Sequence, residues 1–107
     1  MEPLDPEAWK ALLKRRGLWA SKGLGQHFLV SPTAIRAILD ACTDAAGVLE
    51  IGPGPGVLTA SLATPERTVV AIEVDPRMVE TLAETARRAK VLQADALQTD
   101  WAQLLEP

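Results

Sequence analysis

The stretch Val48-Leu49-Glu50-Ile51-Gly52-Pro53-Gly54-Pro55-Gly56 decides the fold of this 107-residue chain. Its first four residues form a short, mostly apolar run that is typical of a strand. The glycines that follow predict a tight turn, and a helix is expected from Val57 to about Ala63. Strand, glycine turn and helix in this order are the opening unit of a parallel α/β sheet.

The rest of the chain continues this alternation of strands and helices. Residues 68–74 are rich in β-branched side chains and predict a second strand, and residues 91–94 predict a third. Asp75-Pro76 is a typical start for the helix between them, and Asp100 is a candidate cap for a last short helix. The expected fold class is α/β, a doubly wound parallel sheet that is incomplete, with about three strands and flanking helices instead of about six strands. We therefore interpret the chain as the N-terminal part of a longer protein.

The first thirty residues differ from this pattern. Asp5-Pro6 predicts the start of a helix that ends at Gly17, with apolar residues along one side. Residues 17–30 are rich in glycine and predict an irregular, functional loop. We therefore divide the chain into residues 1–30, a basic helix followed by a loop, and residues 31–107, the first half of the α/β domain.

The composition excludes several classes of protein. The hydrophobic fraction of 48% is that of a globular protein, and no apolar run approaches the roughly 20 residues needed to span a bilayer. The N-terminus lacks a signal pattern, so we expect a cytoplasmic protein without membrane partners. The single cysteine, Cys42, cannot form an internal disulfide, and no cluster of Cys and His predicts a metal site.

The net charge of −3 hides an uneven distribution, because basic side chains outnumber acidic ones in the first thirty residues. A basic N-terminal segment followed by an acidic remainder is compatible with contact to nucleic acid, although a solvated helix face explains the charges more simply. The candidate nucleic-acid contacts are Lys10, Lys14, Arg15, Arg16 and Lys22.

Candidate ligand-binding residues follow the end of each expected strand, on the edge where open α/β sheets bind ligands. The turn is not a dinucleotide fingerprint, because Val57 or Thr59 stands where G-x-G-x-x-G requires its last glycine. Glu73 is placed to accept both ribose hydroxyls of an adenosine, although it could be an ordinary charge at a strand end. Asp95 and the Ala96 amide are placed to bind adenine, although a helix cap is the more common role of such an aspartate.

Four motifs carry a family resemblance. The acid and three alternating glycines of residues 50–56 resemble motif I of class I S-adenosylmethionine-dependent methyltransferases. Together with G-Q-H-F-L at residues 25–29, A-I-E-V-D at 71–75 and D-A-L at 95–97, they resemble the ribosomal RNA adenine dimethyltransferase family. Its bacterial members act on the small subunit and are known through kasugamycin resistance. The resemblance implies a Rossmann-like class I methyltransferase fold and S-adenosyl-L-methionine as cofactor.

The resemblance also implies roles for individual residues. The loop before residue 30 covers the methionine end of the cofactor, the glycine turn packs against it, and the later acids hold ribose and adenine. Many members have asparagine at position 27, where histidine can also donate a hydrogen bond. The cofactor-binding residues implied in this way are Gln26, His27, Leu29, Glu50, Gly52, Gly54, Glu73, Asp95 and Ala96.

The activity implied is dimethylation of N6 on adjacent adenosines of small-subunit ribosomal RNA, with the immature small subunit as partner. The family's catalytic Asn-Leu/Ile-Pro-Tyr/Phe segment is not among these 107 residues, so no catalytic residue is assigned and we expect no methyl transfer by this chain alone. We also expect uncovered apolar surface and self-association through an exposed sheet edge. Two alternatives stay open: a non-catalytic nucleic-acid-binding assembly or transcription factor of the same fold, and a methyltransferase acting on a small molecule or protein.

Overall fold

The computed structural model describes residues 5–18 and 32–104 and contains the expected alternation of strands and helices. Each expected strand and helix is present, with bounds that lie within two residues of the sequence prediction. In chain order the elements are α1 (Pro6–Arg15), α2 (Pro32–Ala41), β1 (Gly47–Ile51), α3 (Val57–Leu62), β2 (Thr68–Glu73), α4 (Pro76–Thr85), β3 (Lys90–Gln93), the 3₁₀ helix η2 (Ala96–Gln98) and α5 (Trp101–Leu104).

Side-chain caps explain where the helices begin. The Asp5 carboxylate accepts hydrogen bonds from the Glu7 and Ala8 amides, at 3.0 and 3.3 Å, and Pro6 follows it at the first helical position. Asp75 caps α4 in the same way, accepting from the Arg77 amide at 2.8 Å. These caps satisfy amide groups that have no partner inside a helix, which is why the Asp-Pro pairs predicted both starts correctly.

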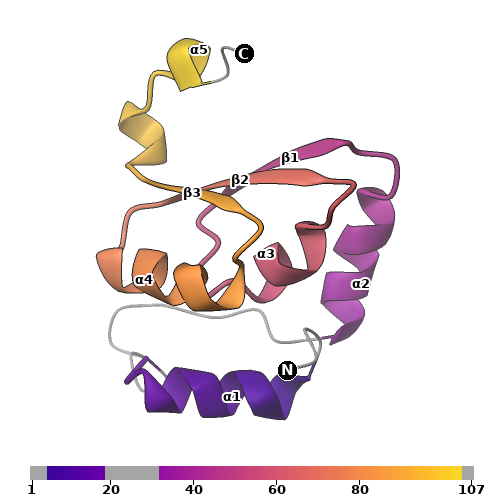
Figure 1. Cartoon of the computed structure of the whole chain (residues 1–107), viewed down its shortest axis with the longest axis vertical. Coiled ribbons are helices and arrows are strands. Elements are labelled where there is room, and N and C mark those ends of the chain that lie inside the picture. The colour runs from indigo at the N-terminus through magenta and orange to yellow at the C-terminus, as the bar shows by residue number, and fades with distance from the viewer. Residues whose placement is uncertain (1–4, 19–31, 105–107) are drawn as a thin grey trace.

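The sheet is parallel, with strand order β1-β2-β3. Ile51 pairs with Ile72, and Glu73 pairs with Gln93, so all three strands end at the same edge. Figure 1 shows α3 and α4 beneath one face of the sheet, with α1 forming a further layer below them. This is the expected class of fold, and the carboxyl edge is where its ligands bind.

Buried side chains tie the helix layers to the sheet. Trp9 of α1, Ile35 of α2 and Val57 of α3 form one cluster of the core. A second cluster joins α1 to α4 through Leu13 and Met78, together with Leu18, which follows α1. A third joins the end of α3 to β2. The apolar side predicted for the first helix is therefore its buried side.

The opposite face of the sheet carries uncovered apolar side chains. Leu49 is 38% exposed and Ile51 is 59% exposed, and of the described helices only the short η2 and α5 lie on that side (Figure 1). This confirms the expected apolar surface. Trp101 lies on α5, a single turn, and is only half-buried. Each outer strand, β1 and β3, has one neighbour among the described strands, and self-association stays a prediction.

Two searches of the described residues bear on other classes of protein. None of the helices in residues 5–18 and 32–104 is long and apolar enough to cross a membrane. Within the same residues, no group of three or more His, Cys, Asp or Glu side chains is placed to hold a metal ion.

Candidate functional site

The glycine turn after β1 is built from backbone that other residues rarely adopt. Gly52, Gly54 and Gly56 have φ angles of +69°, +59° and +99°, in the left-handed region that glycine enters without steric cost. The Gly52 amide donates to the Ile72 carbonyl oxygen at 2.9 Å, which fixes the start of the turn beside β2. The chain then folds back under the sheet edge to begin α3.

The first and third glycines of this turn serve different purposes. A Cβ atom on Gly52 would meet nothing within 4 Å, so the space in front of the turn is open. A Cβ on Gly56 would lie 2.6 Å from Thr85 Oγ1 and 2.8 Å from Leu82 Cδ2. Gly52 therefore leaves room for a ligand to approach the backbone, whereas Gly56 allows α3 to begin directly against α4.

Glu73, at the end of β2, is the central charged group of this edge. Its side chain is only 7% exposed. Oε1 accepts a hydrogen bond from the Gly54 amide at 3.0 Å, and Oε2 accepts one from the Asp75 amide at 2.9 Å. The carboxylate thus connects the glycine turn to the start of α4. Because a carboxylate offers about four lone-pair sites, both oxygens can still accept a hydroxyl donor.

Asp95 lies beyond β3 on the same edge. The Ala94 amide donates to the Glu73 carbonyl oxygen at 3.1 Å, which brings the end of β3 next to the end of β2. Asp95 itself is exposed, and its Oδ1 accepts from the Leu97 amide at 2.9 Å as the cap of η2. The cap explains why aspartate stands at this position. It uses Oδ1, so Oδ2 takes no part in it.

Glu50 and Thr59 form a pair that sequence reasoning only half identified. The Thr59 hydroxyl is fully buried and donates to Glu50 Oε1 at 2.6 Å, which links β1 to α3 beneath the glycine turn. Burial raises the pKa of the Glu50 carboxyl above its usual range, and the hydrogen bond from Thr59 offsets only part of this effect. Thr59 received no role from the sequence, although it closes the motif that runs from Val48 through the glycines.

The Glu50→Gln variant is expected to unfold at a higher temperature than the parent chain at neutral pH. A raised carboxyl pKa means that folding favours the protonated form, so stability from Glu50 is present at acid pH and is lost as pH rises through the folded pKa. Glutamine keeps an acceptor for Thr59 and carries no charge. Thermal unfolding between pH 4 and pH 8 should show an advantage that grows with pH. The Glu80→Gln control, on the exposed side of α4, should show none, and an advantage independent of pH would contradict the burial argument.

The predicted RNA-binding residues have mixed surroundings. Arg15 and Arg16 both bind the Glu84 carboxylate of α4, Arg15 at 2.7 Å, while Lys14 is exposed. Lys10 lies 3.6 Å from a Glu7 carboxylate oxygen of its own helix. Their contact with RNA stays a prediction. Four predicted site residues lie outside the described part of the chain: Lys22, Gln26, His27 and Leu29.

The described edge fits an adenosine-containing ligand. It combines an open approach to a glycine turn with a buried carboxylate, Glu73, whose oxygens can accept two hydroxyl groups. A second carboxylate, Asp95, lies one strand further along the edge. A ribose carries two adjacent hydroxyl groups. These carboxylate acceptors therefore match a nucleoside better than a phosphate, which a carboxylate would repel.

Comparison with known proteins identifies the family. Residues 19–106 match the family described as Ribosomal RNA adenine dimethylase. The chain belongs to this family. It is 45% identical over 104 residues to the Ribosomal RNA small subunit methyltransferase A of Deinococcus radiodurans, an alignment that covers 94% of this chain. The chain spans 36% of the length of that relative.

Solved structures agree with this membership of the dimethylase family. A dimethyladenosine transferase from Plasmodium falciparum superposes with a TM-score of 0.57 and 33% identity, over 68% of this chain and 29% of that one. The N-terminal domain of EvdMO1, solved with SAH bound, superposes with a TM-score of 0.59 at 24% identity, over 67% of this chain and 33% of that one. The second likeness concerns the fold alone. Both confirm the class I methyltransferase fold expected from the sequence.

Proposed function

We propose that this chain is the S-adenosylmethionine-binding part of an enzyme that dimethylates N6 of adjacent adenosines in small-subunit ribosomal RNA. The observation that carries the proposal is the placement of the buried Glu73 carboxylate beside the open glycine turn, in a member of the dimethylase family. Relatives of this chain are named as small-subunit ribosomal RNA methyltransferases, and a protein of the same fold has been solved with SAH.

Different residues of this edge contact different parts of the cofactor. Glu73 accepts the ribose hydroxyls while it keeps the glycine turn in place, and Gly52 allows the backbone to approach. Asp95 and the Ala96 amide hold the adenine ring. Gln26, His27 and Leu29 complete the site over the methionine end. When bound, S-adenosylmethionine supplies a methyl group on a positively charged sulfur.

The buried Glu50 has a supporting role in this proposal. Its charged form is destabilised by burial, and its hydrogen bond to Thr59 holds the end of β1 against α3. A carboxylate kept beneath the turn at the expense of stability suits a site that binds a cationic ligand. The Glu50→Gln variant should therefore combine higher stability with weaker cofactor binding.

Binding of the cofactor is tested by calorimetry on the 107-residue chain. S-adenosylhomocysteine, the demethylated product, is titrated into the chain, and NAD is the comparison ligand because it also carries an adenosine. We expect saturable binding of S-adenosylhomocysteine and none of NAD, which requires the missing G-x-G-x-x-G pattern. Absence of S-adenosylhomocysteine binding, or preference for NAD, would refute the assignment. A transcription factor of the same fold that no longer methylates has no need of the cofactor, so binding also argues against that alternative.

Methyl transfer requires groups that orient the target amine, and none is assigned among these 107 residues. In a purified assay, we therefore expect the chain alone to transfer no tritiated methyl groups from S-adenosylmethionine to immature small ribosomal subunits. A full-length relative of the family is the positive control. Turnover by the chain at about one percent of the control rate would show that it contains a positioning group, because lost positioning costs several orders of magnitude.

A further inference from the structure

We propose that four arginines on the helix side of the sheet form a single surface that binds the phosphate backbone of RNA. This arginine surface consists of Arg15 and Arg16 at the end of α1 and Arg87 and Arg88 just after α4. The inference rests on the proposed function for the identity of the nucleic acid. It adds a location for the RNA backbone that lies away from the cofactor edge.

Glu84 joins the two pairs of arginines. Arg15 Nη2 lies 2.7 Å from Glu84 Oε2, and Arg16 Nε donates to Glu84 Oε1 at 3.0 Å. A second nitrogen of Arg16 also contacts Oε1. These contacts connect residues almost 70 positions apart and hold the basic end of α1 beside the last turn of α4. The two arginines lower the pKa of Glu84, Arg16 more than Arg15, so this carboxylate is ionised at neutral pH.

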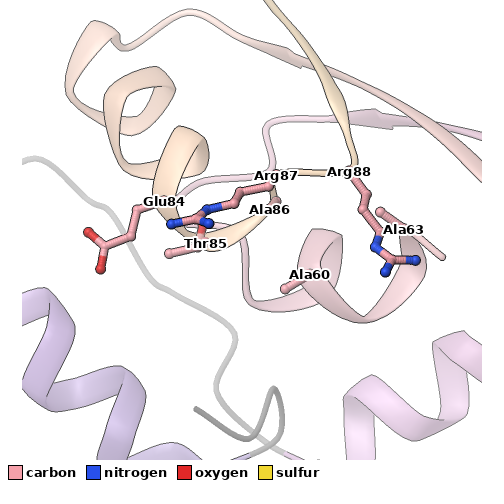
Figure 2. Close-up of a pocket in the computed structure, with 7 residues that line it drawn as sticks. All are labelled: Ala60, Ala63, Glu84, Thr85, Ala86, Arg87 and Arg88. Carbon is pink, nitrogen blue, oxygen red and sulfur yellow. The ribbon is translucent and has the colours of Figure 1, made fainter. Parts of the chain in front are cut away.

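Arg87 and Arg88 are exposed and, among the residues that the structure describes, form no hydrogen bond or ion pair. They line a pocket of about 220 Å³ between α3 and the end of α4, together with three alanines, Glu84 and Thr85. Figure 2 shows the Arg87 side chain extending toward Glu84, and Arg88 extending the other way, toward Ala63. The two guanidinium groups therefore flank the pocket.

The local charge is opposite to that of the whole chain. Acidic side chains outnumber basic ones by 14 to 11 over the full sequence, yet here four arginines accompany one glutamate. Unlike Arg15 and Arg16, Arg87 and Arg88 have no carboxylate partner among the residues that the structure describes, so their guanidinium groups are available to a ligand. Arginine binds phosphate through paired N–H groups, so an unpaired pair beside a pocket favours a phosphate ligand.

The dimensions of the pocket favour a backbone group over a second cofactor. Pockets for cofactors and drug-sized ligands have volumes of about 300–1,000 Å³, more than the 220 Å³ found here. A phosphate or ribose-phosphate group of a longer chain requires less space. Since Arg15 and Arg16 continue the positive charge beyond the pocket, a strand of RNA can contact both pairs.

The part of the arginine surface formed by Arg87 and Arg88 is separate from the cofactor edge. Helix α4 begins at that edge with Asp75 and ends at Thr85, at the opposite edge of the sheet (Figure 1). Substitutions at Arg87 and Arg88 should therefore change RNA affinity and leave cofactor affinity unchanged. This separation keeps a failure of the inference distinct from a failure of the proposed function.

Fluorescence anisotropy with the 107-residue chain tests the inference. The probe is a labelled RNA hairpin with two adjacent adenosines in its loop, titrated over a range of salt concentrations. Arg87→Ala and Arg88→Ala should each weaken binding and lower the log–log salt slope by about 0.7–0.9, the effect of one lost phosphate contact. Arg36→Ala is the matched control, because it removes one exposed arginine from α2, on another part of the surface. A second hairpin with a different loop should lose affinity equally, because phosphate contacts do not read sequence.

The Glu84→Gln variant provides a test of opposite sign. Removing this carboxylate makes the surface more positive and frees Arg15 and Arg16, so RNA should bind more tightly and with a steeper salt slope. Asp40→Asn on α2, which removes an equal charge elsewhere, should change binding much less. A thermal unfolding curve for each variant checks that it remains folded.

Three results would overturn the inference. The first is RNA binding by the Arg87 and Arg88 variants that equals binding by the Arg36 control. The second is no RNA binding by the parent chain while S-adenosylhomocysteine still binds, which leaves the cofactor site intact. The third is binding of poly-glutamate by the parent chain that these variants lose while their RNA binding is unchanged. This result would make an acidic protein the partner.

Discussion

Replacing Glu73 with alanine is expected to remove most of the affinity for S-adenosylhomocysteine and also to destabilise the folded chain. Two hydroxyl contacts to a charged carboxylate are lost, and one such contact contributes about 1.5–3 kcal/mol. This corresponds to a Kd at least about ten- to a hundredfold weaker. Stability falls as well, because the carboxylate accepts the Gly54 and Asp75 amides, at 3.0 and 2.9 Å, in a position only 7% exposed.

The Glu73→Gln variant separates the two effects. Its one carbonyl oxygen can accept one of the two amides, but its NH₂ group faces the other donor, so stability should fall between those of the parent and the alanine variant. Ribose binding should also be weaker than in the parent, because only one acceptor atom remains for two hydroxyls and that oxygen is shared with an amide. Glu80→Ala is the control, an exposed glutamate of α4 whose removal should change stability by less than about 0.5 kcal/mol. Unchanged calorimetric affinity in both Glu73 variants would remove this residue from the cofactor site.

Local signals explain why the fold could be predicted so closely from the sequence. Asp5-Pro6 and Asp75-Pro76 each combine a capping side chain with a residue suited to the first helical turn, and the caps are satisfied within two or three residues. The β-branched run of residues 68–73 likewise needs no distant partner to indicate a strand.

The site was harder to predict because its hydrogen bonds connect distant residues. The sequence places Glu73 at a strand end, but it does not indicate that the carboxylate binds the Gly54 amide, 19 residues earlier. Nor does it indicate that Arg15 and Arg16 share Glu84, since only the packing of α1 on α4 brings them together. Arg87 and Arg88 carry no motif, and their significance depends on the pocket between α3 and α4.

The glycine turn shows the same limit of sequence prediction, because similar residues in it have different roles in the structure. Gly56→Ala is expected to lose a large part of the stability of the chain. The new Cβ would lie 2.6 Å from Thr85 Oγ1 and 2.8 Å from Leu82 Cδ2. Neither neighbour moves freely, since Leu82 is fully buried and the Thr85 hydroxyl donates to the Pro55 carbonyl oxygen at 2.7 Å. Overpacking costs about 1–3 kcal/mol and an unfavourable φ about as much again, against a total stability of about 5–15 kcal/mol for a domain of this size.

Gly52→Ala should instead act mainly on the ligand. Its φ of +69° imposes backbone strain, but its Cβ would meet nothing within 4 Å. Gly17→Ala measures that strain by itself, because Gly17 has a φ of +71° and equally open surroundings at the end of α1. The Gly17 and Gly52 variants should therefore unfold at similar temperatures, well above the Gly56 variant. Only Gly52→Ala should weaken S-adenosylhomocysteine binding in calorimetry, since its methyl group occupies the approach to the turn. Equal affinities for the Gly17 and Gly52 variants would mean that the cofactor does not approach the turn at Gly52.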